Sequence, residues 1–521
     1  MNRNENGNGN EGYEFSTYVL TGDRLRKIVD SVKEYKKREC YRAINDFISG
    51  NIRDKVFILY GLRRTGKTTL IRQVLLNMPL DRFEKAAFIQ IKPGDTLSNV
   101  NHDLETLERQ GYEYIFIDEV TLIGDFIEGA AVFSDIYASS GMKVVLSGTD
   151  SLGFLFAKHE QLYDRCIMLH TTIISYGEFE TVLGIKGIDE YIRYGGTMSV
   201  SGINYNKGIG SSFSTEEATN EYIDSAIAKN IQHSLKHYQD GAHFRGLYEL
   251  FKEDELTSAI NRVIEDINHR FTKEVLTKAY RSNDLSISAR NMLHDRSNPI
   301  DLFDNIDDEL VNDSIKKMLN ILDKDEQKVK IEVEHAYQIK EYLNLLDLVA
   351  EVDINYLPNT NKGKKKVIIT QPGMRYAQAK SLIGSLMSDK IFNSLSILIK
   401  NEVVDRILNE IKGRMMEDIV ILETKLTNPR KKVFQLQFAI GEFDMVIQDT
   451  DKLTCEIFEI KHSDKAVASQ YRHLTDEEKC KETEHYFGKI VEKNVIYRGN
   501  TKKFNGISYI NVEEYLKSLK G

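Results

Sequence analysis

The chain has 521 residues, of which 41% are hydrophobic and 29% are charged, and its net charge is −9. A chain of this length is too long to fold around one hydrophobic core, and its length predicts about three domains. No apolar run approaches the roughly 20 residues of a membrane-spanning helix, so we expect no transmembrane helix and no membrane partner.

The net negative charge excludes a general attraction to DNA or RNA, so any contact with nucleic acid depends on a local basic surface. The start of the chain is rich in Asn, Gly and Glu, so residues 1–16 are expected to be a disordered tail, not a signal peptide, and the protein to be cytoplasmic.

A glycine-rich run follows the apolar, strand-like segment at 56–60. It reads Gly61-Leu62-Arg63-Arg64-Thr65-Gly66-Lys67-Thr68-Thr69. Its glycines let backbone N–H groups face phosphate oxygens, and a helix beginning near Lys67 directs its positive end at the same anion. Lys67 is expected at the β and γ phosphates of ATP, and Thr68 is expected to bind Mg²⁺. The other predicted ATP contacts in this loop are Gly61, Thr65, Gly66 and Thr69.

The next motif is Tyr114-Ile115-Phe116-Ile117-Asp118-Glu119, an apolar run that ends in two carboxylates. Such a run is suited to a buried parallel strand. Asp118 is predicted to hold Mg²⁺, directly or through water, and Glu119 to polarise the water that attacks the γ-phosphate. Alone, the pair could be the polar start of a loop. With a phosphate loop upstream, it predicts a nucleotide-hydrolysing site.

Strand-like runs at 56–60, 86–91, 114–117, 143–147 and 166–170 alternate with helical stretches. This order predicts an α/β fold, namely a P-loop domain with a parallel sheet covered on both faces. The fourth strand runs into Ser147-Gly148-Thr149-Asp150, at the same edge of the sheet as Gly61 and Asp118. We expect Thr149 to sense the γ-phosphate. Ser147 is the second candidate, and capping of the next helix is the alternative role for both.

Residues 185–330 are expected to form a mainly helical region, broken by a Gly-, Ser- and Asn-rich loop at 195–214. The segment 331–385 predicts an amphipathic helix, a strand near 352–357, a lysine-rich turn and a strand near 367–370. That order suits a winged helix, which binds DNA in some proteins and serves as a lid or a protein-interaction surface in others. The lysine-rich turn is either a solvated turn or a phosphate contact.

A second group of candidate catalytic residues lies near the C-terminus. Two segments, 443–447 and 455–461, predict consecutive strands. Glu459 and Lys461 are two residues apart, so they share one face of a strand, and a hairpin would bring Asp444 beside them. Asp444 and Glu459 are predicted to bind Mg²⁺, with Lys461 orienting or deprotonating the water for phosphodiester hydrolysis.

Two further residues are expected at this site. Glu417, on a helix at 413–423, would add a carboxylate, and Gln470 would support the site from the helix that follows. The alternative is an ordinary alternation of charge on a half-buried strand. The order of helix, three strands and helix predicts a restriction-endonuclease-like fold.

Taken in order, these motifs resemble those of bacterial and archaeal AAA-type ATPases, close to the signal-transducing ATPase clade, that carry a C-terminal domain with a PD-(D/E)XK nuclease-like core. The matching segments are Gly61–Leu70, Ile115–Val120, Leu146–Ser151, Ile174–Phe179, Tyr194–Gly196, Tyr342–Tyr376, Gly441–Asp444 and Glu459–Lys461. The resemblance implies ATP binding and hydrolysis. The domains it implies are an ATPase domain at 17–184, a helical lid at 185–330, a winged-helix-like module at 331–385 and a nuclease-like domain at 386–521.

The resemblance also implies nucleotide contacts for two arginines, Arg64 in the phosphate loop and Arg165 before the fifth strand. Members of the family often have Gly-Arg at the second position, whereas this chain has Tyr163-Asp164-Arg165. The missing glycine leaves the role of Arg165 open.

Three functions follow from these residues. The first is an AAA-type ATPase whose nucleotide state controls a Mg²⁺-dependent nuclease-like domain acting on DNA or RNA. The second is a nucleotide-controlled switch that binds a protein or nucleic-acid partner through a nuclease-fold domain that does not cut. The third, a structural protein with a relic phosphate loop, is disfavoured because Lys67, Thr68, Asp118 and Glu119 are all present. Self-assembly is open in each case.

Overall fold

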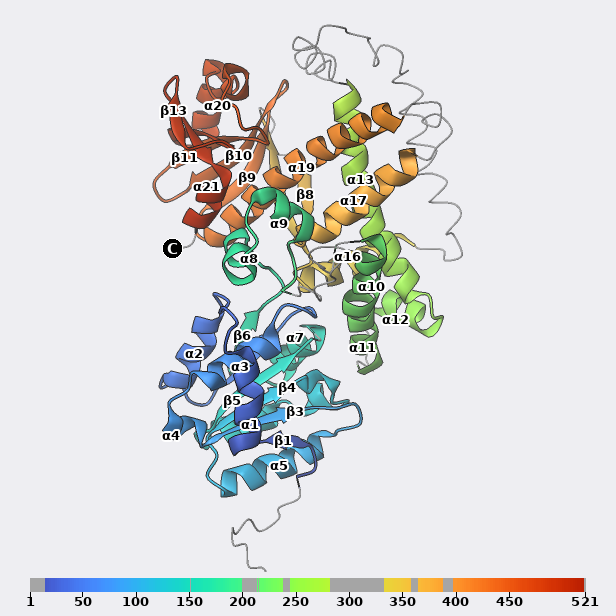
Figure 1. The fold of residues 1–521 in the computed structure, drawn as a ribbon, viewed down its shortest axis with the longest axis vertical. Coiled ribbons are helices and arrows are strands. Elements are labelled where there is room, and N and C mark those ends of the chain that lie inside the picture. The colour runs from blue at the N-terminus through green and yellow to red at the C-terminus, as the bar shows by residue number, and fades with distance from the viewer. Residues whose placement is uncertain are drawn as a thin grey trace, which may run out of the picture. The chain divides into compact units, whose positions relative to one another are not determined.

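The computed structural model describes residues 15–149, 151–198, 213, 215–237, 244–281, 332–357, 364–387 and 397–519. The chain divides into two compact units. The first contains the chain up to Thr172 and again Lys229–Ala242, and the second contains Ile173–Ala228 and His243–Gly521. Figure 1 labels many of the elements of both. None of the described helices is both long enough and apolar enough to cross a membrane.

The first unit is built on a six-stranded sheet with the strand order β1-β3-β4-β5-β2-β6 (Figure 1). The short β1 pairs with β3 in an antiparallel sense, and the other neighbours are parallel. The strands are β1 (Tyr18–Leu20), β2 (Val56–Tyr60), β3 (Ala86–Gln90), β4 (Tyr114–Asp118), β5 (Lys143–Gly148) and β6 (Cys166–His170). The prediction of an α/β fold with a parallel sheet is confirmed, and β1 is an addition that the sequence did not predict.

Helices cover both faces of this sheet because its strands are apolar on both sides. In β2, Phe57 and Leu59 pack with α1, α2 and α3, whereas Val56 and Ile58 pack with the helices that follow β3 and β4. The helices and helical turns of the unit are α1 (Gly22–Val29), η1 (Asp30–Val32), α2 (Tyr41–Ser49), α3 (Lys67–Leu76), α4 (Leu80–Phe83), α5 (Leu97–Arg109), η2 (Val120–Leu122), α6 (Phe126–Gly129), η3 (Phe133–Ala138), α7 (Ser151–Glu160) and α11 (Lys229–His237).

The second unit contains an eight-stranded mixed sheet with the order β13-β14-β12-β11-β10-β9-β7-β8. The consecutive strands β9, β10 and β11 are antiparallel, and β12 returns parallel to β11. The strands are β7 (Val349–Tyr356), β8 (Lys364–Ile369), β9 (Lys432–Gln437), β10 (Glu442–Asp449), β11 (Thr454–Lys461), β12 (Lys489–Tyr497), β13 (Lys502–Phe504) and β14 (Ile507–Asn511).

One face of this sheet packs on the long helix α19, through side chains such as Phe458 and Ile460, and the other packs on α20. Around the strand meander the chain therefore runs helix, three strands, helix, strand. The helices and helical turns of the unit are α8 (Tyr176–Leu183), α9 (Ile188–Tyr194), α10 (Glu216–Tyr222), η4 (Ile223–Ala228), α12 (Arg245–Lys252), α13 (Leu256–Arg281), α16 (Val333–Leu345), α17 (Pro372–Met387), α19 (Ile397–Thr427), η6 (Ala468–Tyr471), α20 (Glu477–Phe487) and α21 (Val512–Ser518).

The structure divides the chain differently from the expected boundaries. The first unit ends at Thr172, not at 184, because α8 belongs to the second unit: Tyr176 N donates to Glu423 at 2.7 Å and Lys517 pairs with Glu180 at 2.7 Å. Part of the helical region expected at 185–330 returns to the first unit as α11. Residues 1–14, most of the loop at 195–214 and residues 282–331 lie outside the described residues.

The hairpin expected in a separate winged-helix-like module is part of the C-terminal sheet. Strand β7 pairs with β8 in the hairpin and also, in a parallel sense, with β9 beyond the expected boundary at 385. The lysine-rich segment contributes to β8, where Lys365 pairs with Glu351 and Lys366 pairs with the buried Asp418. Two of its lysines are thus held by carboxylates of the same unit.

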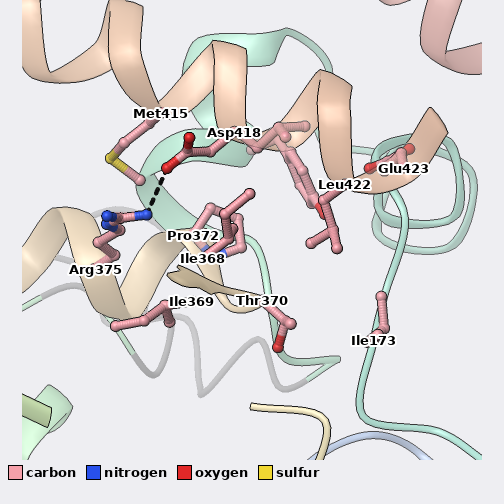
Figure 2. Close-up of a pocket in the computed structure, with 12 residues that line it drawn as sticks. Ile173, Ile368, Ile369, Thr370, Pro372, Arg375, Met415, Asp418, Leu422 and Glu423 are labelled. Atoms are coloured by element: carbon pink, nitrogen blue, oxygen red, sulfur yellow. Dashed lines mark hydrogen bonds and ion pairs between the residues drawn. The ribbon is translucent and has the colours of Figure 1, made fainter. Parts of the chain in front are cut away.

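A buried ion-pair group joins three elements of the second unit. Asp418 of α19 accepts from Arg375 of α17 at 2.7 Å and pairs with Lys366 of β8 at 2.5 Å. Figure 2 shows the Arg375–Asp418 pair at the edge of a small pocket lined mainly by apolar side chains such as Ile368 and Leu422. The Arg375 guanidinium also lies 3.6 Å from the centre of the Phe271 ring. Its charge is therefore compensated inside the core.

We expect Asp418→Ala to destabilise the second unit by about 3–5 kcal/mol, because it leaves two cations without their buried carboxylate. Thermal unfolding of the full chain, followed by circular dichroism, measures the effect. The matched control is Glu351→Ala, which removes an exposed partner of Lys365 and is expected to cost no more than about 1 kcal/mol. Equal effects of the two substitutions would contradict the buried-pair interpretation.

Candidate functional site

The phosphate-binding loop joins the end of β2 to the start of α3. Gly61 and Gly66 have φ angles of 143° and 87°, which favour glycine, and Arg64 has a φ of 65°. The Lys67 ammonium lies inside this loop and donates to the carbonyls of Gly61 and Leu62 at 2.8 and 2.9 Å. The loop thus encloses a buried cation at the positive end of a helix, which is an anion-binding arrangement.

The loop lies against the two residues that follow β6. A Cβ atom at Gly61 would come within 2.6 Å of the Thr171 hydroxyl oxygen. Leu62 N donates to the Thr172 hydroxyl at 3.2 Å, and the Thr65 and Thr171 hydroxyls are 2.8 Å apart. Only glycine at position 61 permits this approach, so the loop is fixed to the end of β6.

Arg38 is a support of the loop that the sequence did not indicate. Its guanidinium donates to the carbonyls of Thr65 at 2.5 Å and Thr171 at 3.0 Å, and the residue is 6% exposed. It therefore bridges the phosphate-binding loop and the end of β6. A lone arginine in a polar N-terminal segment carries no sequence signal for such a role, whereas the Thr171–Thr172 pair directly follows a predicted strand.

Thr68 and Asp118 meet at the expected magnesium position. The Thr68 hydroxyl donates to Asp118 Oδ2 at 2.7 Å. The other carboxylate oxygen, Asp118 Oδ1, is buried and has no hydrogen-bond partner among the described residues. The Ser147 hydroxyl, on the neighbouring strand β5, is also buried and has no hydrogen-bond partner among the residues that the structure describes. A hydroxyl and an unsatisfied carboxylate oxygen fit a hydrated Mg²⁺, which prefers oxygen ligands.

Glu119 follows Asp118 in a left-handed conformation with a φ of 58°. Its carboxylate accepts from the Thr149 hydroxyl at 3.2 Å, so the residue expected to sense the γ-phosphate contacts the residue expected to polarise water. Burial raises the pKa of Glu119. Burial also lowers the pKa of Lys67 to about 8, although Glu119 and Asp118 oppose this shift. Nearby anionic oxygens would favour the charged form of Lys67.

The structure does not bring Arg165 to this site. Arg165 precedes β6 and pairs with Asp135, and Arg165 O accepts from Val56 N at the start of β2. Because β2 and β6 are parallel, this is the edge of the sheet opposite Gly61. Arg64 lies exposed on the loop, and Thr69 lies half-buried in the first turn of α3.

The second site lies in the C-terminal sheet and brings three predicted residues together. The Lys461 ammonium donates to Asp444 Oδ2 at 2.8 Å and pairs with Glu459 Oε2 at 2.6 Å. Ile460 N also donates to Asp444 Oδ2, at 2.7 Å. Glu459 Oε1 is buried without a partner among the described residues. The adjacent strands β10 and β11 produce this cluster, as the hairpin prediction requires.

Burial and mutual charge set the protonation of this cluster. Burial raises the pKa of Glu459, and the Asp444 carboxylate raises it further. Burial also acts to raise the pKa of Asp444, but Lys461 and the Ile460 N–H together lower it. Although burial opposes it, the two carboxylates raise the pKa of Lys461. These shifts in pKa favour the charged forms of Asp444 and Lys461 and the protonated form of Glu459.

Glu417 lies near this cluster, whereas Gln470 does not take part. Burial raises the pKa of Glu417 to about 7, with a contribution from the Asp444 charge, and Arg414 donates to Glu417 at 2.6 Å. Gln470 bonds to the backbone of Val467 and Lys465 in its own turn η6. Among the described residues, no group of three or more His, Cys, Asp or Glu side chains is arranged to hold a metal ion. Any metal here would depend on Asp444 and Glu459.

The sheet order, the loop and the Thr68–Asp118 pair define the first unit as a P-loop α/β domain. Residues 53–180 match a family described as AAA domain, which agrees with the P-loop fold of this part of the chain. A search of curated proteins finds no match.

Three solved structures show a distant likeness. They are the Aeropyrum pernix Orc1 protein in complex with DNA (13% identity, 72% of this chain and 100% of that chain, TM-score 0.24), a closed state of Hsp104 with ATPγS and FITC casein (10%, 92% and 67%, 0.25) and Cdc6p from Pyrobaculum aerophilum (13%, 68% and 98%, 0.24). TM-scores this low support no argument about function.

We expect Arg38→Ala to weaken ATP binding about tenfold, which corresponds to about 1.4 kcal/mol. The substitution leaves two carbonyls without their charged donor and loosens the loop from the end of β6. Titration with a fluorescent ATP analogue measures the effect, and Arg42→Ala, an exposed change on the neighbouring helix α2, is the control. Unchanged affinity in a folded Arg38→Ala protein would contradict the role assigned to Arg38.

Proposed function

We propose that this protein binds and hydrolyses Mg²⁺–ATP and that its nucleotide state controls a Mg²⁺-dependent nuclease-like site acting on DNA or RNA. The observation that carries the ATPase part is the Thr68–Asp118 pair with its unsatisfied oxygen, beside a lysine held by the phosphate-binding loop. The match of residues 53–180 to AAA domains supports the same conclusion.

The residues of the first site have separable roles in this proposal. Phosphate oxygens carry more negative charge than carbonyls, so the Lys67 ammonium would exchange its bonds to Gly61 and Leu62 for bonds to phosphate. Thr68 and Asp118 would hold the Mg²⁺, which neutralises phosphate charge. Glu119 would orient and deprotonate the attacking water, since its raised pKa moves it towards the range of an effective general base. Thr149 would hold Glu119 in place.

The nuclease part of the proposal is supported by the arrangement in the second unit. A helix, an antiparallel three-strand meander, a helix and a strand parallel to the third form the order expected of a restriction-endonuclease-like core. Asp444, Glu459 and Lys461 converge where two carboxylates would hold Mg²⁺ and a lysine would activate water.

The path of the chain supports control of one site by the other. The chain leaves the first unit after Thr172, which bonds to the phosphate-binding loop, and returns at Lys229. Directly after that return, the Asn230 side chain donates to the Thr149 carbonyl, and Thr149 bonds to Glu119. Two of the three points at which the chain passes between the units, after Thr172 and before Lys229, therefore adjoin residues of the proposed ATP site.

A switch without nuclease activity is the competing function, and one observation favours it. The Lys461 ammonium bonds to both carboxylates, so a metal ion must compete with a cation already in place. In that case the second unit would bind nucleic acid or a protein in a nucleotide-dependent way and leave nucleic acid uncut.

We expect Glu119→Gln to lower the ATPase kcat by about 100-fold or more while ATP binding is retained, because the amide cannot accept the water proton. Steady-state phosphate release and ATP titration measure the two quantities. Glu113→Gln, an exposed carboxylate before β4, is the control and should leave both unchanged. Full turnover by the Glu119→Gln protein would remove Glu119 from the mechanism.

We expect Asp444→Asn to abolish cleavage of DNA or RNA in Mg²⁺ or Mn²⁺ while ATP hydrolysis continues, since the variant lacks the anionic carboxylate of the second site. Gel assays of single- and double-stranded substrates, with and without ATP, test this. Asp449→Asn on the same strand β10 is the control. Cleavage that persists in the Asp444→Asn protein refutes the assignment, and no cleavage by the wild type under any condition favours the switch.

A further inference from the structure

A cluster of basic side chains surrounds Asp189 at the end of β11. Asp189 Oδ1 lies 2.8 Å from His462 Nε2, and Asp189 Oδ2 lies 3.5 Å from the Arg498 guanidinium. Arg193, one turn along α9, pairs with Glu190 at 3.3 Å. We call Asp189, Arg193, Lys412, His462 and Arg498 the Asp189 cluster. It joins α9, α19, β11 and the end of β12 within the second unit.

Lys412 of α19 is a member of this cluster that makes no direct ion pair among the described residues. The residue is 8% exposed, and none of the hydrogen bonds or ion pairs among the described residues involves its ammonium group. Burial lowers its pKa, and the charges of Arg193 and Arg498 lower it further against the opposing effect of Asp189 and Glu190. A largely buried lysine whose charge is opposed by two nearby arginines is stabilised by an added anion.

The cluster adjoins the second site through the backbone. His462 directly follows Lys461, and Gly413, next to Lys412, packs against His462, with 3.6 Å between the His462 Cβ and the position of a Cβ at Gly413. Arg498 N donates to the Ser463 carbonyl at 3.0 Å. The Arg193 and Arg498 side chains remain 40% and 31% exposed, so a ligand can reach them from solvent.

We propose that Arg193, Lys412 and Arg498 bind a phosphate group beside the Asp444–Glu459–Lys461 site. Guanidinium groups donate in pairs to phosphate oxygens, and a lysine adds a point charge. The phosphate belongs to the backbone of a nucleic-acid strand if the proposed function holds, and the inference rests on it to that extent. This basic surface is local, as the net charge of −9 requires.

The test uses the full-length protein and labelled 20-nucleotide DNA and RNA strands, single and double, with binding followed by fluorescence anisotropy in EDTA. Lys412→Ala and Arg193→Ala are each expected to weaken binding about tenfold and to lower the slope of log K against log salt by about 1. Lys412→Arg is expected to restore binding, and Lys425→Ala on the same helix is the control. Because the assay is run in EDTA and needs no cleavage, its result does not depend on nuclease activity, which separates this test from that of the proposed function.

A second arm tests free phosphate as the source of the anion. Inorganic phosphate is added at constant ionic strength, and thermal unfolding of the wild type and Lys412→Ala is compared. Loss of oligonucleotide binding in both alanine variants supports a nucleic-acid phosphate. Phosphate stabilisation of the wild type alone, with oligonucleotide binding unchanged, supports a free phosphate at the same site. If folded Lys412→Ala and Arg193→Ala proteins match the wild type in both arms, the proposal is overturned.

Discussion

Gly61 has no side chain, and this lets the phosphate-binding loop lie against Thr171 and Thr172, where a Cβ would come within 2.6 Å of a hydroxyl oxygen. The close approach fixes the loop to the end of β6, and Arg38 bridges the two by donating to the carbonyls of Thr65 and Thr171. The loop in turn positions Lys67 and Thr68, which directly follow it at the start of α3. Thr172 is also the last residue of the first unit before the chain enters the second, so the residue that bonds to the phosphate-binding loop directly precedes the second unit.

The segment that follows is built into the second unit. Tyr176 N bonds to Glu423, Gly373 N donates to the Gly195 carbonyl, and Asp189 contacts His462. His462 is next to Lys461, so the segment that follows Thr172 contacts a neighbour of the Asp444–Glu459–Lys461 cluster within the second unit. In the proposed function, this segment would carry a change in the phosphate-binding loop towards Lys461.

The sequence predicted what local patterns determine. Apolar runs that end in Gly61 and Asp118 predicted parallel strands with their polar ends together, and spacing alone put Glu459 and Lys461 on one face. The sequence did not predict contacts between segments far apart in the chain. Strand β7 pairs with β9 across the expected domain boundary at 385, and α8 belongs to the second unit, where Tyr176 N donates to Glu423. Arg165 could have been placed correctly, because a residue that precedes a parallel strand lies opposite the loop.

Hydrogen–deuterium exchange of the full chain, with and without Mg²⁺–ATP, tests the control of the second site by the first most directly. The Glu119→Gln protein is suited to it because the nucleotide should persist. We predict slower exchange in the phosphate-binding loop together with altered exchange in residues 173–198 and around Lys461. Protection limited to the first unit, with exchange in the second unit unchanged, would contradict nucleotide control of the nuclease-like site.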